Sequence, residues 1–253
     1  MRNILAIAEK ELRSYFASPI AYIIIGLFAL LFGYFFVTYL YFFVQRSSQM
    51  MMGGGSANIN EQMIRGVFLN SAVIVLFVMP MITMRTYSEE KRSGTIELLL
   101  TSPLTDFQII MGKFLGALAL YAAMLLVTML YMAILFFYTT PEWRPIAAGY
   151  LGMLLMGGCF LSLGLFISSL TKNQIVAGFL TFAVFLMLWV INWMGEQAGP
   201  TMSAVLKYLS ITEHFDDFAR GVLDTKHIIY YLTFITFGLF LTAKSVDMER
   251  WRG

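Results

Sequence analysis

The chain of 253 residues is 59% hydrophobic and 13% charged, with a formal net charge of +2. Soluble domains carry roughly 25% charged residues, so this composition excludes an ordinary soluble protein and indicates a chain that crosses a membrane several times. We expect membrane lipid around it and no nucleic-acid partner.

The first 19 residues are predicted to form an amphipathic helix rather than a signal peptide. Charged residues such as Glu9, Lys10 and Arg13 share helical spacing with apolar ones, and no short apolar core precedes a small-residue cleavage site. Such a helix would lie in the membrane interface and bend into the first span near Ser18 and Pro19. An ordinary juxtamembrane tail is the alternative interpretation.

Six apolar segments reach, or nearly reach, the roughly 20 helical residues that cross the hydrocarbon region. They contain no Asp, Glu, Lys or Arg, and they cover residues 20–44, 66–84, 114–140, 146–171, 175–195 and 228–243. The last would rise only about 24 Å, so we expect it to extend toward His227 or Lys244, or the bilayer to thin around it. The sequence therefore predicts an all-α polytopic membrane protein with six transmembrane helices in a single domain, residues 1–253.

The distribution of cations predicts the orientation of these spans. With both termini in the cytoplasm, most of the 17 lysines and arginines fall in cytoplasmic segments, Lys113 among them, as the positive-inside rule requires. Residues 85–107 would then be cytoplasmic. Residues 196–227 would form an external helical hairpin, either re-entrant and covered by protein or lying on the membrane surface.

Residues 85–107, between the second and third spans, form the most informative segment. They combine many charges with a run of leucines, which a solvated loop has little reason to hold, so we expect a partner to cover those leucines. A salt-bridged loop that touches only lipid head groups is the alternative.

The same segment carries signals for a separate short helix. Gly94 can end a helix that extends the second span, and Thr95 can cap a new one with Glu97 in its first turn. Pro103 would end that helix. A capping box beginning at Thr105 would then start the third span.

Small residues predict where helices approach closely. They are Gly112 with Gly116, Gly149 with Gly152, Gly157 with Gly158, and Gly164 with Ser168. Ordinary packing within the chain and a seam between two copies are both consistent with this pattern.

No catalytic or metal-binding pattern is present in the sequence. The phosphate-binding motif G-x-x-x-x-G-K-[ST] is absent, Cys159 lies in the middle of a predicted span, and His214 and His227 lack metal-ligand spacing. The predicted spans also lack the ionisable residues with which many carriers bind a coupling ion. We therefore predict a chain that is not an enzyme, holds no cofactor or metal, and takes any energy for transport from a partner.

These features together resemble the type-2 ABC transporter permeases, and most of all the gliding-motility-associated permease subunit and its relatives of unassigned substrate. The resemblance covers essentially the whole chain. It rests on Glu9-Lys10-Glu11-Leu12, on the stretch from Met84 to Pro103, and on Glu213-His214-Phe215 with Phe218-Ala219-Arg220-Gly221 before the last span.

The resemblance implies a six-helix half of an exporter in the bacterial inner membrane. It would pair with an identical or different permease and with two copies of a separate ABC ATPase, which binds ATP and magnesium. The segment between the second and third spans is the coupling helix in that family. Its expected contact residues here are Glu89, Glu90, Lys91, Arg92, Gly94, Thr95, Ile96, Glu97, Leu98 and Leu99, with Ile96, Leu98 and Leu99 filling a groove in the ATPase. A membrane anchor for an ATPase acting on the cell envelope, or a passive carrier, remains an alternative.

Overall fold

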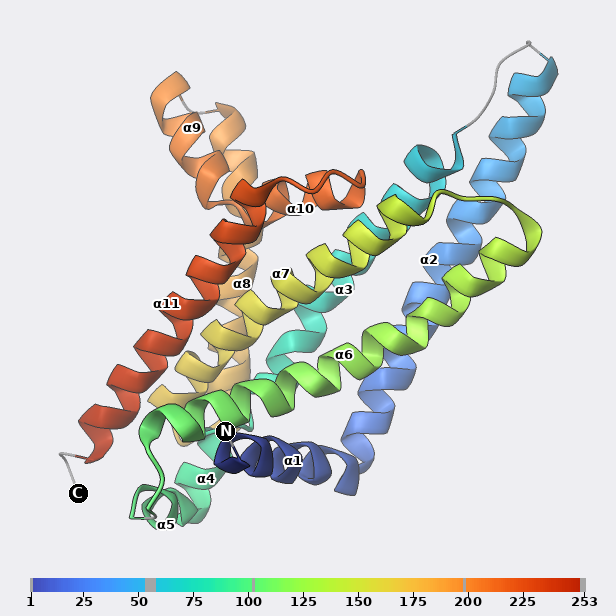
Figure 1. Cartoon of the computed structure of the whole chain (residues 1–253). Helices are drawn as coiled ribbons and strands as arrows, with labels where there is room; N and C mark the ends of the chain where they lie inside the picture. Colours follow the sequence, from blue (N-terminus) through green and yellow to red (C-terminus); the bar gives the residue numbers. More distant parts are fainter. Residues whose placement is uncertain (1, 53–57, 102, 198, 251–253) are drawn as a thin grey trace.

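A computed structural model describes residues 2–52, 58–101, 103–197 and 199–250, and no strand occurs among them. Figure 1 shows the arrangement of the helices. In chain order they are α1 (Arg2–Ala17), α2 (Pro19–Met52), the π-helix η1 (Asn60–Ile64), α3 (Arg65–Thr83), α4 (Ser88–Ser93), α5 (Thr95–Leu100), α6 (Asp106–Tyr138), α7 (Trp143–Leu170), α8 (Gln174–Gln197), α9 (Pro200–Leu209), α10 (Ile211–Ala219) and α11 (Thr225–Arg250).

Six of the described helical segments are long and apolar enough to cross a membrane, and they are built on α2, α3, α6, α7, α8 and α11. The prediction of an all-α, multi-pass membrane protein is confirmed. The last of them, α11, has 26 residues and runs past both His227 and Lys244, so it would rise about 39 Å. The shortness of its apolar run therefore does not limit its reach.

The long helices have two distinct ends. Figure 1 shows α1, α4, α5 and both chain termini at one end, which we call the α5 end, and α9 and α10 at the other, which we call the α10 end. The short helices thus gather at the ends, while the long apolar helices run between them.

The centre of the bundle is α7, which is the most deeply buried of the long helices. Glycines let its neighbours approach its backbone: a Cβ at Gly157 would collide with the ring of Tyr121, and one at Gly164 would collide with Thr83. These partners lie on α6 and α3 of the same chain. Within the described residues, the small residues of α7 therefore serve packing inside the chain.

At the α5 end, α1 packs along α6. A Cβ at Gly112 would lie 2.6 Å from Cβ of Ile7, and a Cβ at Gly116 would lie 2.7 Å from Cβ of Glu11. The predicted break between the first two helices is confirmed, because α1 ends at Ala17 and α2 begins at Pro19. The Gly112 and Gly116 pair is thus covered by the N-terminal helix rather than open to a second copy.

Replacing Gly112 by valine is expected to push α1 away from α6, because the new side chain has no space beside Ile7. Overpacking of this kind typically costs about 1–3 kcal/mol. The midpoint of thermal unfolding of the purified chain should fall. Gly26→Val is a matched control, since a Cβ at Gly26 meets nothing within 4 Å; equal losses for the two variants would contradict the close α1–α6 packing.

Candidate functional site

The segment between α3 and α6 folds as a turn and two short helices. The second span extends to Ser93, before Gly94, as expected, but the turn Met84–Tyr87 interrupts this extension and separates α3 from α4. The hydroxyl of Ser168 on α7 explains the break: it accepts hydrogen bonds from the backbone N–H groups of Tyr87 and Ser88, both at 3.1 Å. Those donors at the start of α4 are thus satisfied by α7 rather than by α3.

Gly94 and the capping box at Thr105 act as predicted, whereas Thr95 lies within α5 and its hydroxyl contacts Ser93 and the Glu90 carbonyl oxygen. Gly94 ends α4 in the left-handed conformation, with φ of 73°, which costs little only for glycine. The helix α5 follows at once and ends before Pro103. At the start of α6 the Thr105 hydroxyl accepts from the Gln108 N–H at 3.3 Å, and the Gln108 side chain accepts from the Thr105 N–H at 3.4 Å. The capping box is confirmed.

A buried ammonium group joins three elements at the α5 end. Lys113 of α6 is 1% exposed, and its Nζ donates to Glu11 Oε1 of α1 at 2.9 Å and to Glu90 Oε1 of α4 at 2.7 Å. Its third hydrogen bond, of 3.0 Å, goes to the Thr86 carbonyl oxygen. An ammonium has three donors, so its capacity is used in full. We call Lys113, Glu11 and Glu90 the Lys113 cluster.

The Lys113 cluster was missed by sequence reasoning, which placed Lys113 in a cytoplasmic segment outside the spans. The helix α6 begins at Asp106, so Lys113 lies in its second turn, between Gly112 and Gly116. A signal was present: a lysine between two glycines spaced for close helix approach faces whatever packs there. The identity of that packing element, α1, could not be read from the spacing.

A second ion pair ties α4 to the far side of the bundle. Lys91 is paired with Glu249 of α11 and donates to the Ser169 carbonyl oxygen of α7, and its side chain is only 8% exposed. At the surface, Arg85 pairs with Glu89 at 3.1 Å. The helix α4 is therefore connected to α1 and α6 on one side and to α7 and α11 on the other.

The apolar residues of α5 point in different directions. Ile96 is 7% exposed and belongs to the chain's own core, whereas Leu98 is 73% exposed. The expectation that Ile96 is exposed is wrong. Residues two positions apart in a helix are rotated by about 200° around its axis, so Ile96 faces the bundle when Leu98 faces outward. Of the remaining predicted contact residues, the exposed ones are Glu89, Arg92, Gly94, Thr95 and Glu97; the Leu99 side chain lies outside the described residues.

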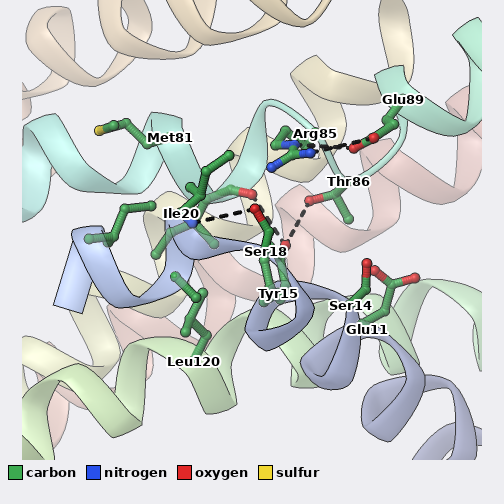
Figure 2. Close-up of a pocket in the computed structure, with 13 residues that line it drawn as sticks. Glu11, Ser14, Tyr15, Ser18, Ile20, Met81, Arg85, Thr86, Glu89 and Leu120 are labelled. Atoms are coloured by element: carbon green, nitrogen blue, oxygen red, sulfur yellow. Dashed lines mark hydrogen bonds and ion pairs between the residues drawn. The ribbon is translucent and has the colours of Figure 1, made fainter.

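A cavity of about 80 Å³ lies between the α1–α2 bend and the end of α3. Figure 2 shows polar side chains of α1 and of the Met84–Tyr87 turn on its walls, with Arg85 directed toward Glu89. Tyr15 spans part of it, donating to the Ile82 carbonyl oxygen at 3.2 Å. Burial raises the pKa of Tyr15 well above its ordinary value, so the hydroxyl keeps the proton with which it links α1 to α3.

Comparison with known sequences assigns the family. Residues 5–244 match the family described as "ABC-2 family transporter protein". This chain belongs to that family. In this ABC-2 transporter protein, α4 forms the end of the second candidate membrane span, Asn60–Ser93, and α5 lies between that span and the third, Asp106–Tyr138.

Two curated relatives of this ABC-2 protein carry the same description, "Probable multidrug ABC transporter permease YbhR", one from Escherichia coli (strain K12) and one from Escherichia coli O157:H7. Each is 29% identical over 153 residues, which is 60% of this chain and 41% of the relative. The match thus spans less than half of the relatives' own length. Family and distant relatives together identify a transmembrane permease subunit.

Proposed function

We propose that this chain is the membrane-spanning subunit of an ATP-driven exporter, and that the outward face of α4 and α5 docks into a separate ABC ATPase. We define this docking face by its exposed residues, Glu89, Arg92, Thr95, Glu97 and Leu98. The observation that carries the proposal is Leu98: an apolar side chain that is 73% exposed within a charged segment at the end of the bundle that holds both termini. An apolar group placed there favours a protein surface that covers it.

Charge–charge contacts support a role in transmitting motion. Glu90 and Lys91, which sequence reasoning expected to touch the ATPase, are instead engaged with Lys113 and Glu249. In the proposed mechanism these two residues transmit force rather than dock. ATP-driven movement of the ATPase would displace α5 and α4 together, and the ion pairs would pass that displacement to α1, α6 and α11.

The remaining parts of the proposal concern the assembly and its orientation. We infer a bacterial inner-membrane location with both termini in the cytoplasm, because the cations are biased toward the side of the termini. A second permease half, identical or different, would complete the transport path. The relatives' description as a probable multidrug ABC transporter permease favours drug transport as the first activity to assay, and a role in gliding motility rests on sequence resemblance alone.

A pair of single substitutions tests docking and orientation together. Leu98→Cys at the α5 end and Leu223→Cys at the α10 end introduce thiols at residues that are 73% and 58% exposed, while the native Cys159 is buried. In membranes of the native host, a thiol-to-amine crosslinker should join Leu98→Cys to a protein with the G-x-x-x-x-G-K-[ST] motif.

Leu223→Cys should give no such product and should react with a membrane-impermeant thiol reagent applied from outside. The same crosslinked ATPase at both positions, or at neither, would contradict the proposed docking face. External labelling of Leu98→Cys instead of Leu223→Cys would show that the orientation is the opposite of the one inferred here.

A further inference from the structure

The two histidines of the chain, which the sequence left without partners, meet at the α10 end. His214 lies on α10 and His227 on the first turn of α11, both nearly buried, and their Nδ1 atoms are 2.6 Å apart. The ring of His214 also stacks on Tyr230 of α11, with centroids 3.8 Å apart. The pair therefore forms part of the junction between α10 and the last long helix.

Hydrogen-bond accounting decides how many protons this pair holds. His214 Nε2 lies 2.9 Å from the Tyr208 carbonyl oxygen, which can only accept, so this nitrogen carries a hydrogen. His227 Nε2 lies 2.7 Å from Asp217 Oδ2. A carboxylate also accepts only, so this nitrogen carries a hydrogen as well.

Two neutral imidazoles arranged in this way would face each other with bare Nδ1 lone pairs. At 2.6 Å such a contact is repulsive, and one additional proton turns it into a hydrogen bond. A proton on Asp217 would satisfy the same chain of contacts. The side chain of Asp217 is 34% exposed, and an ordinary carboxyl is a far weaker base than imidazole, so the proton belongs to the histidines.

We propose that His214 and His227 form a proton-binding site that holds a single proton between their Nδ1 atoms, and that this shared proton strengthens the attachment of α10 to α11. His227 carries the charge because it faces Asp217, while His214 stays neutral and accepts. The site is independent of the proposed docking of an ATPase at the opposite end.

The electrostatic surroundings agree with this division of roles. Burial, the largest effect, lowers the pKa of His214 below its ordinary value of 6.5, and the charges of His227 and Lys226 act in the same direction. The Tyr208 carbonyl and Glu213 oppose that change and are outweighed. The titratable side chains that surround the pair are Tyr208 from α9, Glu213 and Asp217 from α10, Asp224 from the turn before α11, and Lys226, Tyr230 and Tyr231 from α11.

The proposal implies that the junction is strongest within a bounded range of pH. The lowered pKa of His214 means that the unfolded chain gains a proton near pH 6.5 while the folded chain does not. The contribution of His214 to the free energy of unfolding is therefore present above that pH and is lost as the pH falls. On the alkaline side, loss of the shared proton leaves two lone pairs facing each other. Under the proposed orientation, the external pH would control the junction.

The test is a titration of the full chain labelled with ¹⁵N-histidine in lipid nanodiscs and purified by an affinity tag without histidine. Because the chain has two histidines, every imidazole signal comes from the site. In the middle of the pH range we expect one ring with both nitrogens protonated. At lower and at higher pH we expect the Nδ1 signals of both rings to change together. Two rings that titrate independently near pH 6.5, or the absence of any protonated Nδ1, would overturn the proposal.

Two neighbouring aspartates provide a matched pair of variants. Asp217→Asn keeps an acceptor for His227 but removes its counter-charge, so the shared proton should be lost at a lower pH. Asp216→Asn alters a carboxylate engaged with Arg65 and Arg220 and should move that transition much less. Equal shifts in the two variants would refute the assigned partner; if Asp217→Asn does not fold, the titration of the unaltered chain decides.

Discussion

Replacing Lys113 by methionine should destabilise the folded chain by about 3–5 kcal/mol, the range observed when one member of a buried ion pair is removed. The destabilisation would come from the two carboxylates that remain. Glu11 and Glu90, with side chains only 12% and 16% exposed, would face each other without the cation that separates them. Repulsion between them would force α1 and α4 away from α6.

The native Cys159 provides the measurement. It is the single cysteine of the sequence and is buried, so a fluorogenic maleimide should react with it only when the chain unfolds. Lys113→Met should lower the temperature of that reaction strongly. Lys10→Met is the matched control, because Lys10 is 65% exposed and lies 3.8 Å from Glu90; exposed pairs contribute about 0–1 kcal/mol.

A triple variant separates charge from packing. Lys113→Met combined with Glu11→Gln and Glu90→Gln removes the buried charges altogether, and neutral replacement of buried ion pairs is often tolerated. We expect the triple variant to recover most of the lost stability. If it is as unstable as Lys113→Met alone, the loss would reflect packing of the lysine side chain, and the electrostatic account of the cluster would be wrong.

Substitutions of outward-facing and inward-facing residues of α5 should have opposite consequences. Leu98→Asp, together with Glu97→Lys, should abolish binding of the ATPase and the coupled hydrolysis of ATP while leaving the stability of the chain unchanged, because both residues point outward. Ile96→Asp should instead destabilise the chain itself, since its side chain is 7% exposed and an unpaired charge in an apolar core is costly.

The two readouts are co-purification of the ATPase from native membranes and the unfolding temperature followed through Cys159. An outward variant that leaves both ATPase binding and coupled hydrolysis intact would contradict the docking face. An outward variant that unfolds at the temperature of Ile96→Asp would show instead that α5 is packed more completely than the described side chains indicate.

Much of the fold followed from local patterns. Six apolar runs predicted six long helices because a backbone in hydrocarbon must satisfy its own hydrogen bonds, and a helix does so within a single segment. The break at Pro19, the left-handed Gly94 and the capping box at Thr105 were also predicted correctly. Each depends on residues within a few positions of one another, so the sequence contains all that is needed.

The site was predicted less completely. The segment itself and its division at Gly94 were recognised, but the inward direction of Ile96 and the engagement of Glu90 were not. Both depend on the rotation of a short helix against the bundle. A helix of six residues has too little hydrophobic pattern to reveal which side it buries.

The sequence by itself determined the class of the protein, its six long apolar helices and the local starts and stops of its short ones, because composition and caps act through neighbouring residues. Only the tertiary structure decided which polar side chains pair. Lys113 meets Glu11 across 102 positions, Lys91 meets Glu249, and His214 meets His227. Such pairs form only after α1, α6, α10 and α11 have packed, and packing among uniformly apolar helices is chosen by shape and by small residues rather than by any pattern readable along one segment.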